Sequence, residues 1–278
     1  MIGIILISIG TFFREISDSI GKFKVNNHEE SNFTMAFLSL FWGAIFFTLV
    51  SIFKNDGFVF KFASLPTFSI RAVLEIIQTY ITVLAIVGAD RSTYSFVRTI
   101  TIPLLLVVDL LLGYKVGLLP VVGVFIILVA LMMLFLNEGV KKNGIGFVIF
   151  SAINAVATIS LFKYDITHFN SIAAEQLLIT LILLTFFMVL SLFKARENPF
   201  VFLKQPVFFL QSFSVGIGEV IGSFGYNYGA ASIMTAAKRS TAILWSLLSG
   251  KIYFNESELI LKFAIFISLL SGLVLLSI

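Results

Sequence analysis

The sequence predicts an all-α membrane protein of ten transmembrane helices, arranged as two inverted five-helix repeats. Of its 278 residues, 59% are hydrophobic and 12% are charged, and the mean hydropathy is +1.05. These values lie far from those of soluble globular domains. A shift of 141 positions also matches the chain with itself, because Gly88 falls on Gly229 and Arg98 falls on Arg239. We interpret this match as an internal duplication that places one arginine at the same depth in each half.

Ten apolar runs are long enough to cross a bilayer, whose hydrocarbon core of about 30 Å requires about 20 residues of helix. They cover residues 2–21, 33–53, 66–87, 93–113, 117–136, 144–164, 171–193, 206–228, 231–252 and 259–278. The first repeat is expected at residues 1–136 and the second at 144–278, with a polar connecting loop at 137–143. Because each repeat has an odd number of spans, the two copies run in opposite directions, and a binding site is expected at their interface.

The first run carries a polar stripe. Glu15 and Asp18 follow the three-four spacing of one helical face. Arg14 lies one helical turn before Asp18, and this spacing predicts an ion pair between them. Charged side chains inside a membrane face a bundle interior or a wet cavity. The stripe is therefore interpreted either as the lining of a polar pathway or as a self-neutralised cluster that fixes helix packing.

The third run places Arg71, Glu75 and Gln78 on one face. Arg71 lies near the membrane boundary, where a long basic side chain reaches the interface. Glu75 and Gln78 lie deeper. Two roles remain open for them, the lining of a cavity and hydrogen bonding to a neighbouring helix.

The fourth run has Tyr94, Arg98 and Asp109 along nearly one side. Arg98 and Asp109 are separated by about 16 Å along the helix axis, so each requires its own partner or an aqueous pocket. Pro103 interrupts this helix and frees backbone groups, which membrane proteins tolerate next to polar side chains, water or a cavity.

The second half keeps polar residues at similar depths. In the sixth run, Asn154 stands among the residues that replace the charges of the first run. Four glycines of the eighth run share one face, which favours the close approach of another helix: Gly218, Gly222, Gly225 and Gly229. Glu219 in the same run is interpreted either as a proton carrier or as the partner that neutralises Lys238 or Arg239.

Lys238 and Arg239 lie side by side in the ninth run, with Trp245 further along it. Each ionised side chain at mid-bilayer costs about 2.5 to 3.5 kcal/mol, so two adjacent cations require a function. Together with Arg98 they suit a phosphate or carboxylate group, which guanidinium binds bidentately. The second, fifth, seventh and tenth runs are nearly free of polar residues, which predicts six core helices and four outer helices.

The chain resembles the drug/metabolite transporter superfamily, particularly its ten-helix EamA-type members. The resemblance covers nearly the whole sequence and is carried by a repeated pattern: a Gly-Ala helix end, a short turn, an apolar helix ending near Gly113-Tyr114-Lys115 or Phe254-Asn255-Glu256, and a Gly-containing final helix. An acidic residue commonly closes the fourth and ninth helices in that family. In this chain Glu256 holds that position in the second half, whereas Lys115 holds it in the first. Arg98 and the Lys238-Arg239 pair are similar to the phosphate-binding cations of the plastid phosphate translocator branch.

These features predict a secondary transporter that moves a small polar metabolite with an anionic group by alternating access. The cations are expected to bind the anion, the acidic residues to contact a cationic portion or carry a coupling proton, and the aromatic residues to line the pocket. The predicted substrate-binding residues are Arg98, Lys238, Arg239, Tyr94, Glu15, Asp18, Glu75, Gln78, Glu219, Asn154, Tyr226 and Trp245. Two alternatives remain open: an exporter of amino acids or amphipathic compounds with internally paired charges, and a membrane-embedded enzyme.

Catalysis, cofactors and metal ions are not expected. The chain has no cysteine, and its two histidines, His28 and His168, fall between apolar runs without metal-ligand spacing. Most Lys and Arg residues flank apolar runs, so the net charge of +4 indicates contact with the lipid bilayer and no nucleic-acid partner. A bacterial inner membrane is the expected location. The distribution of Lys and Arg among the loops favours external termini, whereas the family resemblance implies cytoplasmic termini.

Overall fold

The computed structural model describes residues 2–54, 57–111, 117–136, 143–256 and 259–277, and within these ranges the chain is helical without a β-strand. The long helices of the first half are α1 (Ile2–Asn26), α2 (Asn32–Phe53), α3 (Leu65–Gly88), α4 (Arg91–Val97) followed by α5 (Thr101–Leu111), and α6 (Leu118–Leu136). Those of the second half are α7 (Ile145–His168), α8 (Ile172–Leu190), α10 (Pro206–Gly225), α11 (Ala231–Phe254) and α12 (Leu259–Ser277). Short helical turns occur in the connections: η1 (Phe62–Ser64), η2 (Arg98–Ile100), η3 (Ser191–Ala195), α9 (Pro199–Phe202) and η4 (Tyr226–Tyr228). Over the described residues, each predicted apolar run overlaps a helix, except that the fourth run is divided into α4, η2 and α5.

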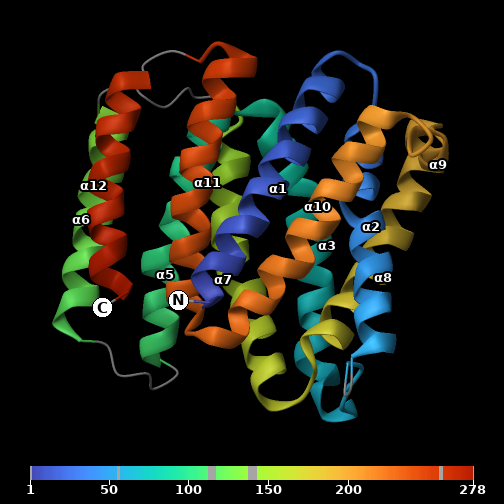
Figure 1. Ribbon diagram of the computed structural model, residues 1–278, viewed down its shortest axis with the longest axis horizontal. Coiled ribbons are helices and arrows are strands. Elements are labelled where there is room, and N and C mark those ends of the chain that lie inside the picture. Colours follow the sequence, from blue (N-terminus) through green and yellow to red (C-terminus); the bar gives the residue numbers. More distant parts are fainter. Residues whose placement is uncertain (1, 55–56, 112–116, 137–142, 257–258, 278) are drawn as a thin grey trace.

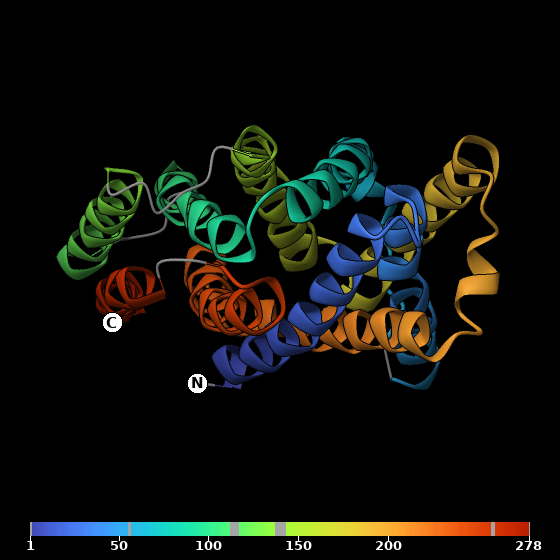
Figure 2. The same cartoon turned by 90° about the horizontal axis from the view of Figure 1, so that it is seen from above.

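The long helices stand side by side, and α1 begins at the same end of the bundle at which α12 ends (Figure 1). Seen from above, α3, α5 and α7 lie along one side and α1, α10 and α11 along the other, with α6 and α12 together at one end and α2 and α8 at the other (Figure 2). The packing is reciprocal: α1 packs mainly on α10, and α7 packs mainly on α3. In addition, α2 packs on α8, α6 on α12, and α11 on both α4 and α5.

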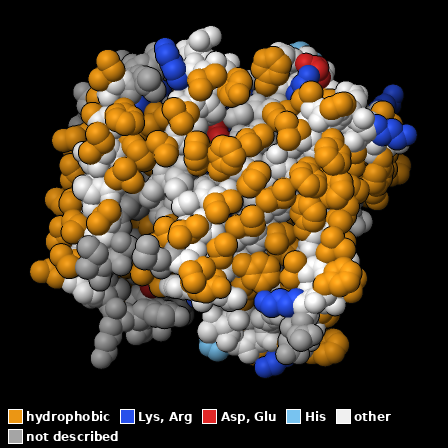
Figure 3. Space-filling view, viewed as in Figure 1, with side chains coloured by type: hydrophobic (Ala, Val, Ile, Leu, Met, Phe, Trp, Pro, Cys, Tyr) orange, Lys and Arg blue, Asp and Glu red, His pale blue; other side chains and the backbone are white. Residues whose placement is uncertain are grey.

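Six helical segments are long and apolar enough to cross a membrane. They are Asn32–Phe53, Phe62–Gly88, Arg91–Leu111, Ile145–His168, Ile172–Ala195 and Pro206–Tyr228. Hydrophobic side chains cover most of the face seen in Figure 3, whereas Lys and Arg gather toward its upper and lower margins. The chain thus has the makeup of an integral membrane protein.

The α1–α10 contact is close because glycines face each other. A Cβ atom added to Gly218 would lie 2.6 Å from the Gly10 carbonyl oxygen, and one added to Gly10 would lie 2.7 Å from the Gly218 carbonyl oxygen. The predicted close approach at the glycine face of the eighth run is confirmed at Gly218. It extends to Gly222 and Gly225, since a Cβ atom added to Gly10 would lie 3.1 Å from the Gly222 backbone nitrogen, and one added to Gly225 would lie 3.0 Å from the Gly3 carbonyl oxygen. A Cβ atom added to Gly222 itself would have nothing within 4 Å.

The predicted interruption of the fourth run is also confirmed. Proline has no amide hydrogen, so Pro103 cannot bond to the carbonyl group of Thr99, and the chain forms the tight turn η2 between α4 and α5. The Thr99 hydroxyl donates to the Phe96 carbonyl oxygen at 2.7 Å, and the Thr101 hydroxyl donates to that of Arg98 at 2.8 Å. This turn sets the position of Arg98 in the middle of the bundle.

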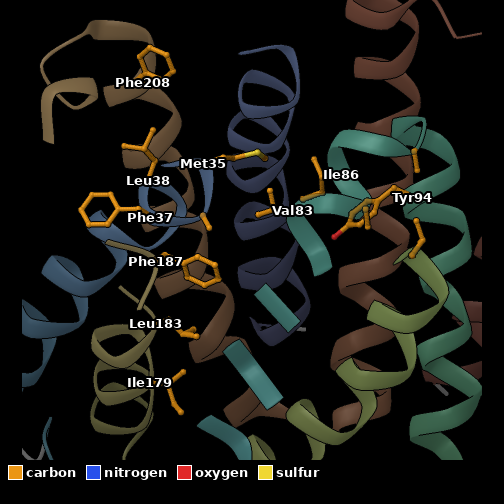
Figure 4. Packing of buried hydrophobic residues seen from close by; sticks show 14 of the residues in the cluster. Met35, Phe37, Leu38, Val83, Ile86, Tyr94, Ile179, Leu183, Phe187 and Phe208 are labelled. Atoms are coloured by element: carbon orange, nitrogen blue, oxygen red, sulfur yellow. The ribbon is translucent and has the colours of Figure 1, made fainter. Parts of the chain in front are cut away.

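The largest apolar core joins α2, α3 and α8, with Phe37, Val83, Leu183 and Phe187 among its buried members (Figure 4). It forms one flank of the central cavity described below. Two of the sequence features fall outside the described residues, namely positions 137–142 of the connecting loop and the Gly113-Tyr114-Lys115 segment.

Candidate functional site

A cavity of about 230 Å³ lies between the two halves of the chain. Its wall takes side chains from α1, α2, α3, α4 and η2 of the first half and from α7, α8, α10, η4 and α11 of the second. Ten of the twelve predicted site residues line it: Arg98, Lys238, Arg239, Tyr94, Glu15, Asp18, Glu75, Gln78, Glu219 and Tyr226.

Two predicted residues are not on this wall. The side-chain amide of Asn154 donates to Gln78 Oε1 at 2.8 Å and to the Leu74 carbonyl oxygen at 3.0 Å, so it ties α7 to α3 behind the cavity. The ring of Trp245 packs against that of Phe12, with 4.8 Å between the ring centroids. Asn154 and Trp245 thus contact a neighbouring helix and do not line the cavity.

The prediction that the second and seventh runs lie outside the core was also wrong. Residues of α2, such as Met35 and Gly43, line the cavity, as do Ile179 and Leu183 of α8. Their lack of charge suggested lipid exposure, but ligand cavities in proteins have mainly apolar walls with a few polar groups. The two helices with few polar residues, α2 and α8, supply that apolar wall.

Arg91 is the centre of a buried ionic cluster that the sequence did not reveal. Its side chain is fully buried, and it donates from Nε to Glu15 Oε1 at 3.1 Å and from Nη2 to Glu15 Oε2 at 2.7 Å. Its Nη2 also contacts Asp18 Oδ2 at 3.2 Å, and Ser249 of α11 donates to Glu15. Arg91 begins a helix directly after a Gly-Ala-Asp turn, which gave it the pattern of a basic residue flanking a membrane span.

Arg14 pairs with Glu219 across the α1–α10 contact. The predicted pair of Arg14 with Asp18 is wrong, as is the pairing of Glu219 with Lys238 or Arg239. The close approach at Gly218 explains this outcome, because a Cβ atom there would lie only 3.3 Å from the Arg14 backbone nitrogen. Glu219 is therefore next to α1 and is neutralised from that side.

Arg71 is buried instead of reaching the interface. It is 2% exposed and donates to Glu175 Oε1 at 2.7 Å and to Gln176 Oε1 at 2.8 Å. Glu75 Oε1 lies 3.6 Å from Arg71 Nε. Gln78 combines both roles considered for it, since it lines the cavity and donates to Ser151 of α7 at 2.9 Å.

Three cations face the cavity without a carboxylate partner. Among the described residues, none of Arg98, Lys238 and Arg239 forms an ion pair, whereas Arg14, Arg71 and Arg91 all do. Arg98 donates to the Tyr94 hydroxyl, and Arg239 Nε donates to Thr101 Oγ1 at 3.3 Å. Lys238 is repelled by its neighbours Arg14, Arg98 and Arg239, and attracted by Glu75.

Tyrosine rings support these cations. The ring of Tyr94 has the Arg91 guanidinium at 5.4 Å and the Arg98 guanidinium at 5.2 Å from its centroid, both within cation–π range. Tyr226 hydrogen-bonds to Thr235 at 3.1 Å between their hydroxyl oxygens. Both rings are almost completely buried, and the Tyr94 ring contacts both Arg91 and Arg98.

Two carboxylates bind helix N-termini of the opposite half. Glu256, which the family pattern singled out, accepts from the backbone amides of Arg91 at 2.5 Å and Ser92 at 3.2 Å, where α4 begins. Asp109 accepts from the Ser232 amide at 3.3 Å, where α11 begins. Negative charge stabilises a helix N-terminus, so each half anchors a cavity-lining helix of the other. Asp109 thereby has its own partner, as its distance from Arg98 required.

The geometry suits an anionic ligand. Three unpaired cations, of which Arg98 and Arg239 are 7% and 6% exposed, are costly inside a bundle unless an anion compensates them. No group of three or more His, Cys, Asp or Glu side chains in the described ranges is arranged to hold a metal ion. Both histidines are exposed and lie outside the cavity wall. No protein-family model and no curated protein matches this chain.

Proposed function

We propose that the chain is a ten-span secondary transporter of the drug/metabolite transporter type, which moves a small metabolite with an anionic group through its central cavity. Its two five-helix halves are inverted copies, and transport proceeds by alternating access around Arg98, Lys238 and Arg239. The protein resides in a bacterial inner membrane with both termini in the cytoplasm.

The helix packing supports two inverted copies. If the halves are equivalent, then α2 corresponds to α8, α6 to α12, and α4–α5 to α11, and each of these pairs packs together. The first helix of each half packs on the third helix of the other, α1 on α10 and α7 on α3. A two-fold axis between copies produces this pattern.

The copies are not in the same state. Helix α2 packs on α10 far more extensively than its counterpart α8 packs on α3. Alternating access requires such a difference, because the halves exchange conformations when the cavity changes sides. The more extensive α2–α10 contact therefore supports a transporter whose structure represents one of its two orientations.

The proposal of an anionic substrate rests on one observation. Within the described chain, the three central cations have no carboxylate partners. Six basic and four acidic side chains line the cavity, and all four acidic ones lie beside Arg14, Arg71 or Arg91. An exporter with internally paired charges would require partners for Arg98, Lys238 and Arg239 as well. A phosphate or carboxylate group supplies that partner and forms bidentate bonds with guanidinium.

The test has two stages. Purified protein is heated with inorganic phosphate, phosphate monoesters, dicarboxylates or zwitterionic amino acids, and a bound ligand raises the melting temperature in proportion to the logarithm of its concentration over Kd. The stabilising compound is then measured in counterflow with proteoliposomes. We expect an anion to stabilise the protein and to exchange unchanged across the membrane. Stabilisation by zwitterions alone, or chemical conversion of the compound, would refute the proposal.

A further inference from the structure

The turn between α1 and α2 buries a carboxyl group against α10. Glu30 and Gln211 are only 3% and 1% exposed, and the Gln211 side-chain amide donates from Nε2 to Glu30 Oε1 at 3.1 Å. Helix α1 closes over this contact, because a Cβ atom added to Gly21 would lie 2.9 Å from Gln211 Nε2. The two side chains therefore meet inside the packing of α1 on α10.

Each of these two groups has one oxygen atom without a partner. Glu30 Oε2 and Gln211 Oε1 are both buried and form no hydrogen bond. Buried acceptors without donors are costly. An ionised carboxylate and an amide oxygen only accept, so neither can satisfy the other, whereas a protonated carboxyl group carries an O–H donor. A single proton on Glu30 Oε2 would supply the donor that Gln211 Oε1 lacks.

No ion pair joins Glu30 to a basic side chain in the described ranges. On α1, Lys24 lies 2.5 Å from Glu29 Oε2 and is committed to that carboxylate, and Lys22 donates to the Ala89 carbonyl oxygen. Helix α2 carries no charged residue. The basic residues between α8 and α10 are exposed, namely Lys194, Arg196 and Lys204. A proton is therefore the positive charge left to neutralise Glu30.

Two carboxylates beside the turn disfavour an ionised Glu30. Glu29 precedes it, and Glu197 accepts from the backbone amide of the following residue, Ser31, at 3.1 Å. Glu30 lies outside the membrane-spanning helices, and burial raises its pKa to about 8, with the repulsion of Glu197 and Glu29 acting in the same direction. The Gln211 hydrogen bond and the Lys24 charge oppose this rise in pKa without cancelling it.

The connection before α8 offers a comparison within the same chain. Helix α8 begins, like α2, after a serine whose side chain caps the helix, and the residue before that serine is Asn170 in place of Glu30. The buried Asn170 side chain donates to the Ser64 hydroxyl at 2.9 Å and accepts from the Lys61 backbone amide at 3.0 Å. A protonated carboxyl group shares this ability to donate and accept, whereas a carboxylate does not.

We propose that Glu30 is a proton-binding site and that its protonated carboxyl group forms a closed acid–amide pair with Gln211. In this pair Gln211 Nε2 donates to Glu30 Oε1, and the Glu30 O–H donates to Gln211 Oε1. The acid–amide pair fastens the α1–α2 turn to α10. This proton site requires no transport activity, so it stands apart from the function proposed above.

Proton release loosens the contact between α2 and α10. An ionised Glu30 loses one of the two hydrogen bonds to Gln211, has no cation in contact and is repelled by Glu197 and Glu29. A buried carboxylate in this situation is stabilised by moving into water. The turn that carries it leads directly into α2, so the start of α2 moves away from α10 at alkaline pH.

The proton is tested by infrared spectroscopy of the purified protein in lipid, because the carbonyl stretch of a protonated carboxyl group is separate from that of a carboxylate. We expect a carboxylic acid band that disappears with a midpoint near pH 8 and is absent in Glu30→Gln. In Gln211→Leu the band should shift to higher wavenumber, since the carboxyl group loses its hydrogen bonds. Glu219→Gln, which changes a carboxylate paired with Arg14, should leave the band unchanged.

Two results would overturn the proton site. One is an acid band that Glu30→Gln leaves intact or that Gln211→Leu leaves at the same wavenumber. The other is a gain in melting temperature from sodium chloride over choline chloride that Glu30→Gln abolishes, because the two free oxygens would then bind a metal cation in place of the proton.

The effect on the helix contact is tested with a single cysteine. Ser212 of α10 is fully buried and donates to the Leu38 carbonyl oxygen of α2, so Ser212→Cys, in a chain without other cysteines, reacts with a maleimide only when these helices separate. Its labelling rate is compared with that of Ser212→Cys combined with Glu30→Gln at each pH, so that the ionisation of the thiol affects both alike.

Glutamine at position 30 donates and accepts without a proton, so it keeps the turn fastened to α10 at every pH. We expect the ratio of the two labelling rates, without and with Glu30→Gln, to be near one at neutral pH and to rise several-fold above pH 8. A ratio that stays near one throughout would overturn the coupling of this proton to the α2–α10 contact.

Discussion

The glycine contact between α1 and α10 offers a sharp stability prediction, the effect of Gly218→Ala. The added Cβ atom would lie 2.6 Å from the Gly10 carbonyl oxygen, about 0.8 Å short of the 3.4 Å at which ordinary contact begins. The obstacle is backbone, so α1 and α10 must move apart. Overpacking of this kind costs about 1 to 3 kcal/mol, which exceeds the gain in helix propensity of at most about 1 kcal/mol for replacing glycine by alanine.

Gly222→Ala is the matched control on the same helix, since its Cβ atom would have nothing within 4 Å. We expect it to be neutral or slightly stabilising. The assay is reversible unfolding in mixed micelles, with thermal melting in detergent as a second readout. The double variant Gly10→Ala with Gly218→Ala should cost less than the sum of the single variants, because one separation of the helices relieves both clashes. Equal stability of Gly218→Ala and Gly222→Ala would refute the described α1–α10 contact.

Two further stability predictions follow. Arg91→Met leaves Glu15 and Asp18 buried without their cation, so it should lower the free energy of unfolding by about 3 to 5 kcal/mol. Arg14→Met should cost less, since the Arg14 side chain is 30% exposed; an equal loss in the two variants by the same assay would contradict this ranking. Glu30, which lies between α1 and α2, is buried, and burial raises its pKa from 4.5 to about 8. Because the folded state binds this proton more tightly than the unfolded state, the contribution of Glu30 to stability is greatest below pH 4.5 and falls by about 1.4 kcal/mol per pH unit up to about pH 8. Melting curves over this range should show the loss in the wild type and less of it in Glu30→Gln, and identical pH profiles would argue against a buried, protonated Glu30.

The positions of the helices could be predicted from the sequence because they depend on local properties. Runs of apolar residues form helices in a membrane, where every backbone group must bond within its own segment. Pro103 and the glycine at position 218 also acted through local geometry, one by removing an amide hydrogen and the other by allowing close contact. These effects require no knowledge of which helix lies next to which.

The charge pairs could not be predicted in the same way. Arg14 has Asp18 one turn away in sequence, yet it binds Glu219, 205 positions further along the chain. Arg91 and Arg71 have the sequence pattern of interface residues, and only the packing of α4 and α3 against other helices buries them. The three cations without carboxylate partners, by contrast, line the cavity, and their placement within apolar runs already indicated an enclosed polar space.

In the proposed transport cycle, the unpaired cations of the cavity bind the transported anion. This binding is tested most directly by counterflow in proteoliposomes that compares Lys238→Gln with Lys251→Gln. Both variants remove one lysine charge from α11, but Lys238 lines the cavity and Lys251 is exposed near the end of the helix. We predict that Lys238→Gln loses exchange of the stabilising anion while Lys251→Gln retains it. Equal exchange by the two variants would contradict the claim.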